Sequence, residues 1–89
     1  MQSQTIPIIN KLGLHARAAA KLVTTASKFS SEIHVTHNGQ TVNGKSIMGI
    51  MMLAAARGSE IQVTASGSDE ADALLAIRQL IENRFGEEQ

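Results

Sequence analysis

The chain of 89 residues contains no cysteine, no tryptophan and no tyrosine, and it has only two phenylalanines. Without cysteine the protein has no disulfide, no thiolate metal site and no thiol nucleophile, which fits a reducing cytoplasm. The scarcity of aromatic side chains leaves no platform for stacking nucleic-acid bases. The formal net charge of +0 also argues against a nucleic-acid binder. We therefore expect no metal, no cofactor and no nucleic-acid partner.

The chain also lacks a long hydrophobic run. No apolar stretch approaches the roughly 20 residues that a membrane span needs, and residues 1–4 have neither the basic segment nor the apolar core of a signal peptide. We expect a cytoplasmic protein that does not insert into membranes. The length suffices for one modest core, so we assign residues 1–89 to a single domain and expect a monomer.

The charges sum to zero but are unevenly divided along the sequence. Residues 1–57 carry six basic side chains and one acidic side chain (+5), whereas residues 58–89 carry two basic and seven acidic side chains (−5). The basic half would attract phosphate groups and an acidic partner surface. Ordinary scatter of surface charge is the alternative interpretation.

Hydrophobic periodicity predicts the element order β-α-β-β-α-β-α. We expect strands at residues 5–9, 32–37 and 60–65, a further strand after Asn38-Gly39, and helices at 16–28, at 47–55 and after Ser68 as N-cap. The Asn38-Gly39 pair favours a two-residue hairpin turn that pairs Val35 with Val42 on the buried face. Pro7 lacks a backbone N–H and therefore places the first strand at an edge of the sheet.

This pattern predicts an α+β fold, an open-faced two-layer sandwich. Its four-stranded antiparallel sheet would have one polar face, with three helices covering the other. We expect Arg57-Gly58 to end the second helix and Ile77, rather than Arg78, to face the core from the last one. Residues 87–89 are expected to form a frayed tail.

His15 precedes an alanine-rich helix that we expect to begin at Ala16. Histidine is an unusual N-cap, and a helix start presents unpaired N–H groups and a positive field that suit phosphate. The same field disfavours imidazolium, so we expect a neutral, nucleophilic ring. The side chain of Arg17, with the backbone of Ala16, Arg17 and Ala18, would hold phosphate oxygens. We hypothesise that His15 accepts and passes on a phosphoryl group; the alternative is a histidine that merely caps a helix and faces water.

The second predicted helix has more apolar residues than one buried stripe requires. If Ile50 and Leu53 face the sheet, four large apolar side chains remain, of which we expect at least one in the core and the others exposed: Ile47, Met48, Met51 and Met52. Exposed methionines form adaptable docking surfaces, and Ala20 and Thr24 of the first helix would extend this one. The alternative is that the methionines fill the core.

Ser46 has two interpretations. As the N-cap of the second helix, its side chain would contribute about 1 kcal/mol to stability. As a phosphorylation site, it would gain roughly two negative charges at the rim of the methionine surface and would repel an acidic partner. The residues alone favour the cap.

These motifs together resemble the HPr family, the histidine-containing phosphocarriers of the bacterial phosphotransferase system. The resemblance covers nearly the whole chain and depends on the segments Gly13-Leu14-His15-Ala16-Arg17, Asn38-Gly39 and Lys45-Ser46-Ile47-Met48-Gly49-Ile50-Met51. It implies that Enzyme I phosphorylates His15 on Nδ1, using phosphate derived from phosphoenolpyruvate, and that the group passes to EIIA-type domains. Since the partner proteins largely catalyse both transfers, such a chain is a phosphoryl carrier rather than an independent enzyme.

The resemblance also assigns roles to other residues. Arg17 matches the active-site arginine, Ser46 matches a serine that HPr kinase/phosphorylase modifies in many bacteria, and residues 47, 48 and 51 match an apolar docking surface. It further implies that the first and third strands lie at the sheet edges. The family usually has proline where this chain has Ala18. This departure leaves the sugar branch and the nitrogen branch of the system both open, and it leaves open how stable the phosphorylated histidine is.

Besides a nucleic-acid binder, a second rival function is open. A regulatory binding module in carbon or nitrogen control would act through Ser46 and the Met48/Met51 surface without phosphotransfer. The intact His15-Ala16-Arg17 segment argues against this module.

Overall fold

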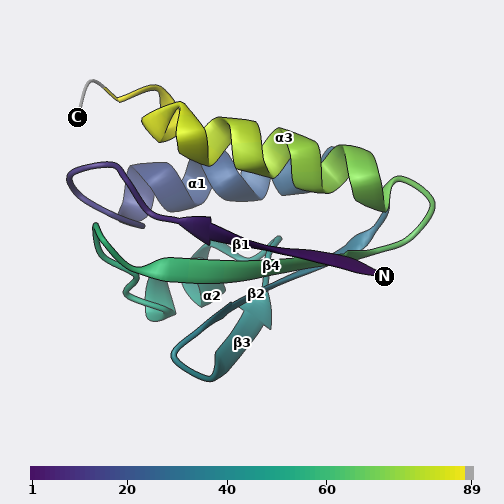
Figure 1. The fold of residues 1–89 in the computed structure, drawn as a ribbon, viewed down its shortest axis with the longest axis horizontal. Coiled ribbons are helices and arrows are strands. Elements are labelled where there is room, and N and C mark those ends of the chain that lie inside the picture. Colours follow the sequence, from purple (N-terminus) through teal and green to yellow (C-terminus); the bar gives the residue numbers. More distant parts are fainter. Residues whose placement is uncertain (88–89) are drawn as a thin grey trace.

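The computed structural model describes residues 1–87 and confirms the predicted order of elements (Figure 1). The chain forms β1 (Gln2–Pro7), α1 (Ala16–Ala26), β2 (Glu32–His37), β3 (Gln40–Asn43), α2 (Ile47–Met52), β4 (Glu60–Ser66), α3 (Glu70–Glu82) and a final single-turn helix, η1 (Arg84–Gly86).

The four strands form one antiparallel sheet in the order β1-β4-β2-β3. The edge positions of β1 and β3 confirm the placement inferred from Pro7 and from the family resemblance. Val35 pairs with Val42 and His37 with Gln40, as the hairpin motif predicted. Asn38 (φ 51°) and Gly39 (φ 79°) adopt the left-handed conformations that such a tight turn requires.

One face of the sheet is buried and the other is polar, as the alternation predicted. Helices α1 and α3 run along the buried face (Figure 1), and α2 packs against α1 and β3. Ile50 of α2 is fully buried in the same core as Leu22 of α1 and Ile77 of α3, so all three helices cover one face. Leu53 and Ile81 are also buried as expected. These observations confirm the open-faced two-layer sandwich.

Several element boundaries differ from those predicted. Strand β1 begins at Gln2 and ends at Pro7, although Ile8 stays buried and its backbone bonds to Gly58 and Ser59. Helix α1 ends at Ala26, two residues before the predicted end. Its last turn tightens into shorter-range bonds, from Lys28 N–H to Thr25 and from Phe29 N–H to Ala26.

The predicted end of α2 and the predicted N-cap of α3 were also wrong. Helix α2 ends at Met52 because Ala54 turns into the left-handed region (φ 51°), so Arg57-Gly58 does not end it. Helix α3 has Asp69 rather than Ser68 as its N-cap residue. The Asp69 carboxylate does not cap the helix but accepts hydrogen bonds from Ser30 and Ser31, which ties the connection between α1 and β2 to the start of α3.

The expected frayed tail was wrong at Glu87, whose side chain is held by the protein. Three consecutive left-handed residues, Arg84 (φ 54°), Phe85 (φ 55°) and Gly86 (φ 76°), turn the chain from α3 back toward the start of α1. Phe85 is fully buried. Residues 88 and 89 of the predicted tail lie outside the described part of the chain.

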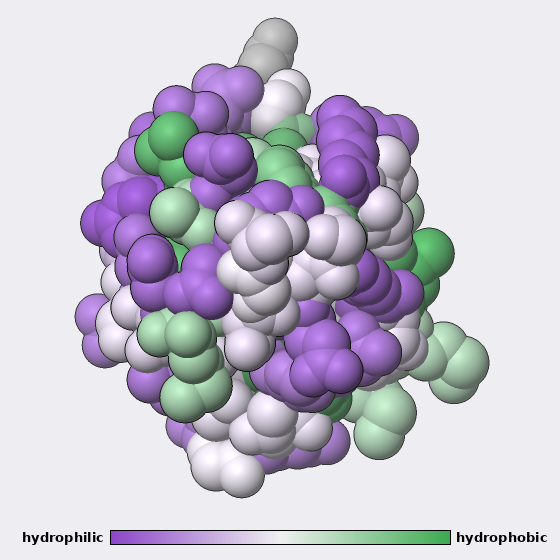
Figure 2. Space-filling view, turned by 90° about the vertical axis from the view of Figure 1, so that its right-hand side faces the viewer, coloured by the Kyte–Doolittle hydropathy of each residue, from purple (hydrophilic) through white to green (hydrophobic). Residues whose placement is uncertain are grey.

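Within residues 1–87, no helix has the length and apolar character to cross a membrane. The end of the molecule that carries the N-terminus and the β4–α3 connection is mainly hydrophilic, with isolated hydrophobic side chains (Figure 2). The start of α1, where His15 lies, is at the opposite end (Figure 1).

Candidate functional site

The loop that carries His15 is fixed by the loop that follows α2. Gly13 is left-handed (φ +66°), and a Cβ on it would lie 2.5 Å from the carbonyl oxygen of Ala55. The next residue, Leu14, is buried, and its N–H donates to the same carbonyl at 3.0 Å. Only glycine allows this approach without strain. The two loops therefore set the backbone position of His15.

His15 is the N-cap residue of α1, as predicted. Its backbone is extended (φ −76°, ψ 178°), and its side chain makes no capping hydrogen bond. The first helical bond runs from Ala19 N–H to the His15 carbonyl at 2.8 Å, so the N–H groups of Ala16, Arg17 and Ala18 have no acceptor within the helix. The Arg17 side chain is exposed. Unpaired amides, an imidazole and a guanidinium thus share one helix start, although the described residues show no hydrogen bond between the side chains of Arg17 and His15.

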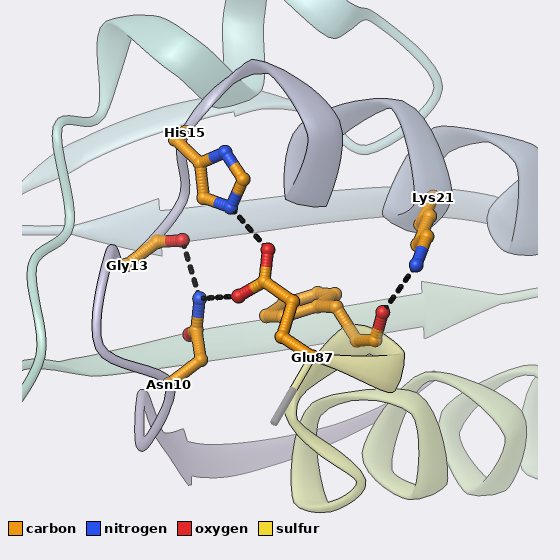
Figure 3. Close-up of polar contacts among 6 residues, drawn as sticks. Asn10, Gly13, His15, Lys21 and Glu87 are labelled. Atoms are coloured by element: carbon orange, nitrogen blue, oxygen red, sulfur yellow. Dashed lines mark hydrogen bonds and ion pairs between the residues drawn. The ribbon is translucent and has the colours of Figure 1, made fainter. Parts of the chain in front are cut away.

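The ring of His15 faces the C-terminal segment (Figure 3). Its Nε2 atom lies 2.5 Å from Oε2 of Glu87, and the side chains of His15 and Glu87 are 27% and 15% accessible. Within residues 1–87 the other ring nitrogen, Nδ1, has no hydrogen bond. The simple interpretation of a histidine that caps a helix and faces water therefore does not describe this ring.

Asn10 holds the second oxygen of the Glu87 carboxylate. Its Nδ2 group donates to Oε1 of Glu87 at 3.0 Å and to the Gly13 carbonyl at 2.8 Å (Figure 3). Partial burial opposes ionisation of Glu87, but the hydrogen bonds from Asn10 and His15 and the positive charge of Lys21 lower the pKa of its carboxyl group. A carboxylate is thus held in a fixed orientation beside the ring.

Lys21 anchors the same segment from α1. Its Nζ atom donates to the carbonyl oxygen of Phe85 at 2.5 Å, while the Phe85 side chain fills the core. No motif in the sequence predicted that Asn10, Lys21, Phe85 or Glu87 belongs to the site. Histidine and carboxylate are 72 positions apart, and no local pattern signals their contact.

The apolar surface of α2 is more exposed than expected. All four side chains point outward, including Met48 at 75% and Met52 at 62% exposure, so the expectation that at least one packs in the core was wrong. Ile50 of this short helix and its C-cap residue, Leu53, already fill the inward positions. On α1, Thr24 is exposed and Ala20 is half-buried. Leu12, which precedes the His15 loop, is exposed as well and was not identified from the sequence.

Ser46 is the N-cap of α2, as its first interpretation predicted. Its Oγ atom accepts a hydrogen bond from Gly49 N–H at 3.1 Å. Ser46 is half-buried and directly precedes the exposed side chains of α2. No cluster of His, Cys, Asp and Glu suited to a metal ion is present in the described residues.

Comparisons with known proteins agree with this geometry. The family model described as "PTS HPr component phosphorylation site" matches residues 2–83. A phosphocarrier protein HPr of Neisseria meningitidis is 59% identical over 87 residues, covering 98% of each chain. The crystal structure of HPr-C-His from Thermoanaerobacter tengcongensis has a TM-score of 0.96 at 53% identity with full coverage of both chains. A structure of an HPr dimer from the same organism has a TM-score of 0.79, covering 98% of this chain and 100% of that one.

These matches cover nearly the whole chain, and they accompany the fold and the histidine at the helix start that the residues predicted. The chain belongs to the HPr family of phosphocarriers of the phosphotransferase system.

Proposed function

We propose that this chain accepts a phosphoryl group on His15 from Enzyme I and passes it to EIIA-type domains. One observation carries the proposal: a partly accessible imidazole stands at a helix start with three unpaired amides, in a chain of the HPr family. A relay site has to be open enough to meet a donor and then an acceptor, and a side-chain accessibility of 27% allows this.

The chemistry requires only positioning and charge stabilisation. The lone pair on Nδ1 of His15 attacks the phosphorus atom in line, and the P–N bond forms as the bond between phosphorus and its donor atom on Enzyme I breaks, with that electron pair returning to the donor. The amides of Ala16, Arg17 and Ala18 and the Arg17 guanidinium would stabilise the negative oxygens of the transferring group. Transfer to an EIIA-type domain is the reverse displacement on a new acceptor.

The exposed face of α2 is the proposed docking surface for both partners. Ile47, Met48 and Met51 would pack against an apolar partner surface, and Ala20 and Thr24 of α1 would extend the contact. Phosphorylation of Ser46, for example by an HPr kinase/phosphorylase, would place a dianion at the rim of this surface and weaken binding of an acidic partner. The purely regulatory alternative needs no reactive imidazole, so a phosphorylation assay separates the two.

We also propose that the chain acts as a cytoplasmic monomer with one domain. Each transfer needs only one His15 and one partner surface, so one copy suffices. Sedimentation equilibrium over a range of concentrations tests this proposal; a constant dimer mass would contradict it.

The function is tested by incubating the protein with phosphoenolpyruvate and Enzyme I and measuring its mass before and after acid treatment. We expect one acid-labile phosphoryl group per chain, none on His15→Ala and an unchanged amount on Ser46→Ala. An acid-stable label, or an acid-labile label that persists on His15→Ala, would contradict the proposed function.

A further inference from the structure

We propose that Glu87 is a positioning residue for phosphotransfer: its carboxylate fixes the tautomer and orientation of His15 and stabilises the phosphorylated ring. This inference rests on the proposed function of His15. It concerns the side chain of Glu87, whose Oε2 atom lies 2.5 Å from Nε2 of the imidazole.

The carboxylate of Glu87 is held at two points. Oε2 faces Nε2 of His15, while Oε1 accepts from Asn10, which is fully buried and also bonds to the Gly13 carbonyl. The carboxylate is therefore fixed to the same loop that sets the backbone of His15 (Figure 3). Side-chain rotation of Glu87 would break both contacts.

The contact selects one ring nitrogen for reaction. A neutral imidazole carries a single N–H and a single lone pair. An acceptor as strong as a carboxylate beside Nε2 places the proton there, which leaves the lone pair on Nδ1. Nδ1 is also the nitrogen with no hydrogen bond among residues 1–87. The geometry thus points to the same nitrogen that the family resemblance implied, and by an independent route.

The same carboxylate acts on the product. When Nδ1 forms its bond to phosphorus, Nε2 keeps its proton and the ring becomes a cation. A carboxylate at hydrogen-bond distance stabilises that cation more than it stabilises the neutral ring. Glu87 should therefore shift the transfer equilibrium toward phosphorylated His15. The bonds that form and break in the transfer stay the same.

The backbone conformation of residues 84–86 brings Glu87 to the start of α1. Arg84 and Phe85 adopt left-handed conformations that cost energy in residues with a side chain. They are held there by burial of the Phe85 side chain and by the bond from Lys21 to the Phe85 carbonyl. The sharp turn that results carries the chain from the end of α3 to the start of α1.

The test compares Glu87→Ala, Glu87→Gln and a matched control, Glu32→Gln, in which an exposed glutamate of β2 is replaced. Nitrogen-15 NMR of the His15 ring reports its tautomer, and mixing with phosphorylated Enzyme I gives the transfer equilibrium. We expect Glu87→Ala to lose the Nε2–H tautomer preference and to shift the equilibrium away from phosphorylated His15 by about tenfold or more.

The amide of Glu87→Gln can still accept from Nε2–H but carries no charge, so we expect the tautomer to be kept and the equilibrium to shift. Glu32→Gln should change neither quantity. Unchanged tautomer and equilibrium in both Glu87 variants would overturn the proposal, and so would faster or more complete phosphorylation, because the carboxylate would then be competing with the phosphoryl group. If the unaltered chain takes no phosphoryl group, the proposed function fails, while the tautomer measurement still decides whether Glu87 positions the ring.

Discussion

Gly13 and Ala55 lie so close that a side chain on Gly13 would meet the Ala55 carbonyl oxygen at 2.5 Å. This approach joins the loop before α1 to the loop after α2, and it fixes the residue two positions before His15. The candidate site and the proposed docking helix are therefore parts of one rigid arrangement.

We expect the variant Gly13→Ala to be less stable than the unaltered chain and to be phosphorylated more slowly. The new Cβ meets backbone atoms that cannot move easily, and alanine is strained at φ +66°, so we expect a loss of about 2 kcal/mol or more in the free energy of unfolding. Urea unfolding measures this loss.

Gly39→Ala is the matched control, because Gly39 is also left-handed (φ +79°) but has open space around it. Its free energy of unfolding should fall by only about 1 kcal/mol, which is the cost of placing alanine in the left-handed conformation. Equal losses in the two variants would show that the contact with Ala55 is unimportant.

The acid stability of the fold should depend on Asp69. Hydrogen bonds from the Ser31 hydroxyl and from the Ser30 amide lower the pKa of this carboxyl group from 3.8 to about 2. A carboxyl pKa that is lower in the folded state stabilises the fold above the unfolded pKa, and this contribution disappears as the pH falls through the folded pKa. We expect unfolding free energy to fall between about pH 4 and pH 2, and Asp69→Asn to remove that part of the slope.

Asp72→Asn is a suitable control for Asp69→Asn. Asp72 lies in the first turn of the same helix but is exposed. The unfolding free energy of Asp72→Asn should therefore depend on pH in the same way as that of the unaltered chain. Urea unfolding at a series of pH values measures the difference, and an identical slope in Asp69→Asn would rule out this role of Asp69.

Replacing Ala18 by proline tests the departure from the usual family motif. Ala18 is the third helical residue, and its N–H has no acceptor in the helix. Proline would remove this donor without breaking a helical bond. We expect Ala18→Pro to be phosphorylated and its phosphohistidine to hydrolyse faster by about twofold to tenfold, because one stabilising donor is lost. Equal hydrolysis rates would show that alanine in place of the usual proline does not affect the stability of the phosphohistidine.

Met48→Ala should weaken the encounter with Enzyme I and leave the fold intact. Its side chain is 75% exposed, so we expect the unfolding free energy to change by no more than about 0.5 kcal/mol. The KM for phosphorylation by Enzyme I should rise severalfold, because the variant can no longer make the apolar contact that the Met48 side chain would make with Enzyme I.

Leu75→Ala provides the comparison, because Leu75 is 54% exposed but lies on α3 rather than α2. Its KM should stay unchanged. If both variants raise KM equally, the docking surface is not confined to α2.

Sequence reasoning succeeded where the determining interactions are local. The Asn38-Gly39 turn fixes its own hairpin register, Pro7 excludes a central strand, and the helix start after His15 depends on adjacent residues. Ser68 and Asp69 are both good N-cap types, and the choice between them depends on Ser30 and Ser31, which lie far away in sequence.

The role of the C-terminus could not be predicted for the same reason. Arg84 and Phe85 carry no signal for left-handed conformations, which non-glycine residues adopt only when tertiary packing holds them there. The contact between Glu87 and His15 joins residues 72 positions apart. The neutral state of the His15 ring, inferred from the field of the helix, remains a prediction.

The proposed relay requires that His15 carries the phosphoryl group on Nδ1. Phosphorus-31 and nitrogen-15 NMR of the chain after incubation with phosphoenolpyruvate and Enzyme I tests it most directly. We expect one phosphoryl group bonded to Nδ1 of His15, with the proton kept on Nε2. A phosphoryl group on Nε2, or on any residue other than His15, would contradict it.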